Sequence, residues 1–126
     1  MAGSSASVTY EEENPVKKIL IDWVSDDATG AVSVSTKKIT GRIVRLVTDP
    51  GAAAPTAAYD VTLTDPEGLD VLKGLGADRS ATVTEDVNIV YTGTSDHPYV
   101  NDVLALNITN AGNSKNGQVI IYTIGG

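Results

Sequence analysis

The chain has 126 residues, 41% of them apolar, no cysteine and a formal net charge of -7. This length suits a single domain, and without cysteine neither disulfides nor thiolate metal sites are available. No cluster of Lys or Arg suggests nucleic-acid binding, which draws most of its affinity from neutralising phosphates. No apolar run is long enough for a spanning helix, and residues 1–7 lack the basic and apolar regions of a signal peptide. We therefore expect no nucleic-acid partner, no membrane partner and no export by the general route.

The first 14 residues predict an extended arm, followed by one domain over residues 15–126. Side chains that favour strands occupy positions 8–10, and the three glutamates after them discourage burial. We expect this arm to contribute nothing to the core and to order on a neighbouring subunit, adding its backbone to a sheet edge. A frayed terminus is the alternative. The expected partner-binding residues are Val8, Thr9, Tyr10, Glu11, Glu12 and Glu13, with the glutamates facing basic groups of the partner.

Short runs that alternate apolar and polar residues predict strands through the first half of the domain. Residues 16–24 form the first of these strands. Residues 31–48 predict either two strands or one strand bent at Gly41, where the missing side chain suits a bulge. A further strand covers residues 59–64, and the turn after it leads to residues 69–75, which predict a helical turn or an irregular crossover.

The second half continues the pattern, with a strand from Asp86 onward and a closing hairpin that pairs residues 103–109 with residues 118–124. Seven or eight short strands between turn residues predict an all-β fold, an antiparallel β-sandwich. The apolar residues that share one face of each predicted strand are expected to form the core. They are Ile19, Ile21, Trp23, Ile43, Val61, Leu63, Ile89, Leu104, Leu106, Ile108 and Ile121.

The motifs of the chain give no catalytic constellation. His97 is the only histidine and lies in a polar loop, and no Gly-x-Ser-x-Gly motif supplies a nucleophile. We expect a solvated loop histidine and no enzymatic activity. Zinc would need more nitrogen or sulfur ligands than the chain offers. Trp23 alternates with isoleucines, so we expect a core anchor and not a sugar-stacking surface.

Two acidic loops are candidates for calcium, which prefers oxygen ligands. The first loop contains Asp22, Asp26 and Asp27, and the second contains Asp60, Asp65, Glu67 and Asp70. Neither loop matches the spacing of an EF-hand. Turn formation already explains the carboxylates of the second loop, so we expect no metal and no cofactor.

Three segments carry a resemblance to a known class of protein: residues 16–23, residues 41–51 with their Arg-Leu-Val-Thr-Asp-Pro-Gly ending, and residues 107–122. Over residues 15–126 the chain resembles small virion proteins from the structural gene blocks of tailed bacteriophages, without a signature motif. The resemblance implies a capsid decoration, or cement, protein that is made in the host cytoplasm and binds the outer surface of the major capsid protein lattice. It also implies a homo-oligomer, with a trimer favoured. No binding residue transfers from the resemblance.

Other functions remain open at this point. A tail or neck component of the same virion would use the same sandwich as a joint or spike. A carbohydrate-binding module is a third possibility and a small hydrolase a fourth. An acidic surface suits the outside of a capsid, since it would avoid the packaged DNA.

Overall fold

The structure is a computed structural model that describes residues 5–12, 16–26, 29–90 and 96–125. Within these ranges the chain forms seven strands and no helix, and therefore no helix there could cross a membrane. The all-β class is confirmed. The strands are β1 (Ser5–Glu12), β2 (Val16–Val24), β3 (Val32–Pro50), β4 (Asp60–Thr64), β5 (Glu85–Asn88), β6 (Tyr99–Thr109) and β7 (Asn116–Ile124).

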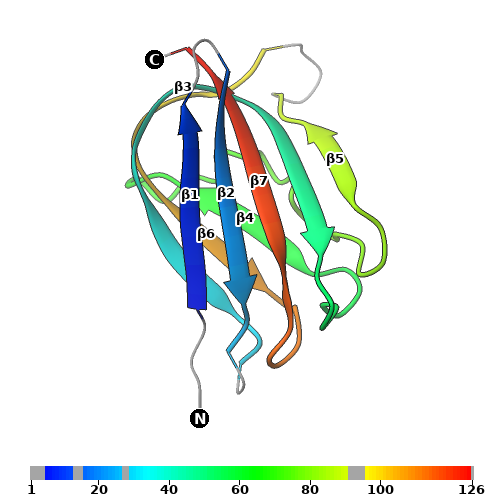
Figure 1. The fold of residues 1–126 in the computed structure, drawn as a ribbon. Helices are drawn as coiled ribbons and strands as arrows, with labels where there is room; N and C mark the ends of the chain where they lie inside the picture. Colours follow the sequence, from blue (N-terminus) through cyan, green and yellow to red (C-terminus); the bar gives the residue numbers. More distant parts are fainter. Residues whose placement is uncertain (1–4, 13–15, 27–28, 91–95, 126) are drawn as a thin grey trace.

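The strands belong to one antiparallel sheet in the order β1-β2-β7-β3-β6-β4, with β5 also paired to β3. The 19-residue strand β3 pairs with β6 through residues 32–42 and with β7 through residues 42–50. It therefore belongs to two layers that face each other. The front layer consists of β1, β2, β7, the second half of β3 and β5, and the back layer consists of the first half of β3, β6 and β4 (Figure 1).

Strand β3 changes layer at Gly41, which confirms the bent-strand alternative. Gly41 has φ 121°, a value that side chains rarely tolerate. A Cβ atom at this position would lie 2.6 Å from the carbonyl oxygen of Ile124. Register shifts occur on both sides of the bend, between Ser35 and Lys38 and between Ile43 and Arg45, and such bulges sharpen the bend of a strand.

The core lies between the two layers and contains every residue predicted for it. All eleven predicted core residues are buried, with at most 2% of each residue exposed. Further residues from the strands and from the segments between them complete the cluster, namely Val32, Ile39, Leu46, Tyr59, Val71, Leu72, Val100, Ala111 and Val119. Apolar side chains at alternating strand positions thus fill the space between the layers.

The predicted hairpin between the last two strands is wrong. β6 pairs with β3 and β4 in the back layer, whereas β7 pairs with β2 and β3 in the front layer. The connection crosses from one layer to the other and uses positive φ angles at Asn110, Gly112 and Ser114. Ser25 fixes the crossing, since its hydroxyl donates to the Gly112 carbonyl at 2.6 Å and accepts from the Lys115 amide at 2.8 Å.

The segment after β4 folds back along the outer edge of that strand. The Val71 amide donates to the Leu63 carbonyl at 2.7 Å, and the Val61 amide donates to the Gly76 carbonyl at 2.8 Å. The segment contains turns and no helix, so the irregular crossover is the alternative that the structure supports. It covers the edge of the back layer at β4.

Candidate interaction surfaces

The N-terminal segment of the chain is a strand of its own sheet. β1 pairs with β2 from Ser5 opposite Val24 to Glu12 opposite Lys17. Ala6, Val8 and Tyr10 are partly buried against the core. Residues 5–12 therefore lie inside the sheet, whereas we expected an arm outside it that contributed nothing to the core.

The predicted partner-binding residues divide between the two faces of β1. Val8 and Tyr10 point toward the core, and Thr9 and Glu11 are exposed on the other face. Glu12 is exposed and forms an ion pair with Lys37 of the same chain, which lowers the pKa of the Glu12 carboxyl. Glu13 lies outside the described residues.

Tyr10 is the link between β1 and the first half of β3. Its hydroxyl accepts a hydrogen bond from the Lys37 amide at 2.8 Å, and the Lys37 ammonium lies 4.5 Å from the centre of its ring. A side chain, and not a ladder of backbone hydrogen bonds, thus connects the two strands.

A pocket of about 330 Å³ opens beside this contact, and its lining includes the four lysines Lys17, Lys18, Lys37 and Lys38.

Four strand edges end the two layers, and the chain treats them differently. β1 and β5 end the front layer, and β4 and the first half of β3 end the back layer. The first half of β3 pairs with β6 on one side, and on the other side its Lys37 amide contacts the Tyr10 hydroxyl of β1. The crossover segment covers the edge of β4. β5 has only four residues, and short edge strands offer little to pair with. β1 has eight residues and is the terminal strand of the front layer, with no strand on its outer side among the described residues.

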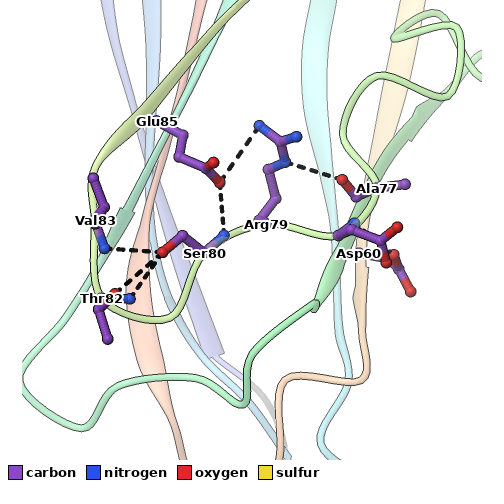
Figure 2. A network of polar contacts seen from close by, with 8 residues as sticks. Asp60, Ala77, Arg79, Ser80, Thr82, Val83 and Glu85 are labelled. Atoms are coloured by element: carbon purple, nitrogen blue, oxygen red, sulfur yellow. Dashed lines mark hydrogen bonds and ion pairs between the residues drawn. The ribbon is translucent and has the colours of Figure 1, made fainter.

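A polar network closes the end of the sandwich next to Tyr59. Figure 2 shows Glu85 accepting from the Ser80 amide at 2.6 Å and facing the guanidinium of Arg79 at 3.7 Å. The Ser80 hydroxyl in turn accepts from the amides of Thr82 and Val83. These contacts stabilise the turn before β5, and nothing in their geometry points to catalysis.

Three buried polar atoms lie near this network without a hydrogen-bond partner among the described residues. They are the indole nitrogen of Trp23 and the hydroxyls of Thr48 and Tyr59. Burial raises the pKa of the Tyr59 phenol, and the nearby Thr48 hydroxyl offsets part of that rise. The position of Trp23 in the core is the one expected from its sequence spacing.

His97 is attached to the sheet, whereas we expected a solvated loop side chain. Its Nδ1 lies 2.6 Å from the carbonyl oxygen of Ile89, which can only accept, so Nδ1 carries the proton. The side chain is half-buried. It joins the segment before β6 to the end of β5 and has a structural use.

The second acidic loop uses its carboxylates to hold turns. Asp65 accepts from the amides of Glu67 and Leu69, each at 3.0 Å. Asp70 accepts from the amides of Leu63 and Leu72 through one oxygen and from Gly74 through the other. In the first loop, Asp22 accepts from Gln118 and Asp26 from Thr29, and Asp27 lies outside the described residues. No group of three potential ligands gathers among the residues that the structure describes.

Comparisons of the chain with protein-family models, with curated proteins and with solved structures found no match.

Proposed function

We propose that the chain is a non-enzymatic attachment protein that binds a larger protein assembly through the open edge of β1. The observation that carries this proposal is that the crossover segment covers the edge of β4 and β5 is short, whereas the eight-residue strand β1 pairs with no strand on its outer side among the described residues. On that side, the side chains of Tyr10 and Glu12 contact Lys37 in the first half of β3. A long edge strand presents unpaired backbone donors and acceptors, and natural proteins cover or shorten such edges unless another chain pairs with them. An extended segment of a partner would add to β1 as a further strand.

The lysines beside β1 favour an acidic partner segment. Lys17, Lys37 and Lys38 line the pocket between β1 and the first half of β3, and only Lys37 has an ion pair among the described residues. Carboxylates of an added strand would meet this group and direct its approach. The same edge is the place where the predicted residues Val8 to Glu12 would contact a partner.

The assembly that we propose is the outer surface of a tailed-phage capsid, on the basis of the sequence resemblance described above. The chain would decorate or stabilise that surface as a homo-oligomer. A tail or neck position is the second candidate, and it has the same support from the resemblance. A carbohydrate-binding role has no specific support, because the one tryptophan is buried at 2% exposure.

The test uses proline substitutions on β1 and purified virion parts. Successive amides of a strand point alternately to its two sides, so of Val8→Pro and Thr9→Pro, one variant removes an amide that faces the open edge and the other breaks a bond to β2. The variant that keeps the melting temperature of the wild type is the useful one. We expect it to lose cosedimentation with phage heads, whereas Lys73→Ala, a change in the crossover segment, keeps it. Cosedimentation with tails alone would favour the second candidate. Unchanged binding of the stable proline variant to heads would contradict attachment through β1.

A further inference from the structure

The outer face of the front layer carries an apolar row that is separate from the core. Leu20 of β2 lies opposite Ile120 of β7, which lies opposite Val47 of β3. None of these three residues belongs to the core cluster, whereas Ile19, Ile121 and Leu46, their neighbours in sequence, all do. Leu20 and Ile120 are half-buried, and Val47 is buried, with 8% of the residue exposed. Because side chains alternate between faces, the row lies on the side of the sheet that faces the viewer in Figure 1.

Charged rows lie on the two sides of this apolar row, and their signs are opposite. Two residues toward one end of the strands, Lys18 and Arg45 lie on either side of Tyr122. Their charged groups are 5.6 Å and 4.6 Å from the centre of its ring. Two residues toward the other end, Asp22 and Asp49 lie on either side of Gln118. The face is thus positive, apolar and negative in succession along both β2 and β3.

We infer that this face pairs with the same face of a second copy of the chain. A two-fold axis that runs across the strands, over Leu20, Ile120 and Val47, turns the positive row of each copy onto the negative row of the other. Lys18 then lies opposite Asp22 of the other copy, and the apolar rows meet. Such an isologous contact is the commonest way in which soluble proteins form homo-oligomers.

The area of the face suits a dimer. The five strands lie about 4.8 Å apart and rise about 3.3 Å per residue. Four of them contribute eight or nine residues and β5 contributes four, so the face covers about 620 Å². This area lies at the lower end, about 600 Å² per partner, of specific interfaces. The contact leaves the outer edge of β1 at the side of the layer. Lys18 also lines the pocket beside β1, so the two proposed surfaces meet at this residue.

Three of the four charged residues on this face already have polar partners within the chain. Asp22 accepts a hydrogen bond from the Gln118 side chain at 2.7 Å. Arg45 forms an ion pair with Asp86 at 2.6 Å, and Asp49 accepts a hydrogen bond from Thr84 at 2.9 Å. Arg45 therefore neutralises Asp86, which lies at the end of the apolar row. Lys18 and Asp22 form no ion pair among the described residues. They are the residues on which a test of the pairing depends.

The experiment measures the mass of the chain by sedimentation equilibrium for the wild type and for charge variants. Lys18→Glu would place two acidic groups opposite each other, and Asp22→Lys would do the same with two basic groups. The double variant, Lys18→Glu with Asp22→Lys, restores opposite charges between copies. Within one copy these two residues are about 13 Å apart along β2, so a rescue reports contact between copies. Lys73→Glu, a change of the same charge in the crossover segment beside the back layer, is the matched control.

We expect the wild type and Lys73→Glu to sediment at twice the chain mass of 13.1 kDa. Each single variant should weaken the pairing about tenfold or more, and the double variant should recover most of that loss. Added salt should weaken the wild-type pair, because exposed charges are screened. A wild type that stays monomeric up to about 1 mM, a trimer, or a double variant as weak as the single ones would each overturn the inference. Loss of particle binding in Lys18→Glu with a monomeric wild type would assign the face to the larger assembly instead.

Discussion

The rings of Trp23 and Tyr59 lie in the core with their centres 5.8 Å apart and their planes tilted by 52°. This arrangement is one that aromatic pairs favour, and it fills the space under the end of the front layer. The Tyr59 hydroxyl, however, has no hydrogen-bond partner among the described residues.

We expect Tyr59→Phe to keep or slightly raise the free energy of unfolding, because it removes a buried polar atom without removing the ring. Tyr59→Ala should cost about 3 to 5 kcal/mol. Urea titrations of both variants check this, and a large loss in Tyr59→Phe would show that the hydroxyl has a partner.

The stability of the protein should fall at high pH because of the same residue. Burial raises the pKa of Tyr59 above the value of about 10 that it has in the unfolded chain. Between the two pKa values the folded state holds more protons than the unfolded state, so the free energy of unfolding decreases as the pH rises. Below about pH 10 this contribution is complete. Melting curves at a series of alkaline pH values should show a steeper decline for the wild type than for Tyr59→Phe, and equal slopes would contradict the assignment.

Gly41→Ala should destabilise the protein much more than a glycine change at an open turn. The new Cβ would meet the Ile124 carbonyl oxygen at 2.6 Å and would also strain a backbone with φ 121°. Gly68 also has a positive φ, but a Cβ there meets no atom within 4 Å. Gly68→Ala thus measures the backbone strain alone, at about 1 kcal/mol. The difference in melting temperature between the two variants measures the close approach at the bend.

Leu106→Ala should cost about 2 to 5 kcal/mol, the range for removing a buried leucine side chain. Leu106 is fully buried on β6, whereas Val103 on the same strand is 50% exposed. Val103→Ala is therefore the matched control, and its cost should stay below about 0.5 kcal/mol. Similar costs for the two variants in an unfolding titration would place Leu106 outside the core.

His97→Ala should lower the free energy of unfolding by about 0.5 to 1.5 kcal/mol, the net contribution of one hydrogen bond. The lost contact is the one from Nδ1 to the Ile89 carbonyl. His97→Asn keeps a donor at a similar position and should recover part of the loss. Attachment to the particle should be equal in both variants. Loss of a hydrolytic activity in His97→Ala would contradict the non-enzymatic proposal.

The alternation of apolar and polar residues predicted the all-β class and eleven residues of the core, all of which are buried. β2 spans 16–24, as the sequence indicated, and the break at Gly41 indicated the bend of β3. In a strand, every second side chain is buried, and this alternation can be read from the sequence of that strand alone. Tyr59 and Val119 are also buried, but the core prediction left them out. Tyr59 shares the strand face of Val61, and Val119 shares that of Ile121, so alternation alone would have placed both residues in the core.

Strand partners were harder to predict, because alternation does not say which strands lie side by side. The prediction paired 103–109 with 118–124 since the two runs follow each other in the chain, but β7 lies between β2 and β3. The prediction of an N-terminal arm was wrong for a related reason. Three consecutive glutamates at 11–13 suggested a solvated arm, whereas β1 pairs with β2 along its length and packs Ala6, Val8 and Tyr10 against the core. The opposite signs of Lys18 and Asp22 gained meaning only once their neighbours across the sheet were known.

The position of β7 also determines when the protein can fold as it is synthesised. β2 and β3 are made early, but neither pairs with the other, because β7 separates them in the front layer. That layer cannot close until the ribosome has made residues 116–124. Until then the apolar sides of β2 and β3 lack their neighbour, and exposed unpaired strands of this kind are the segments on which chaperones act and from which aggregates grow.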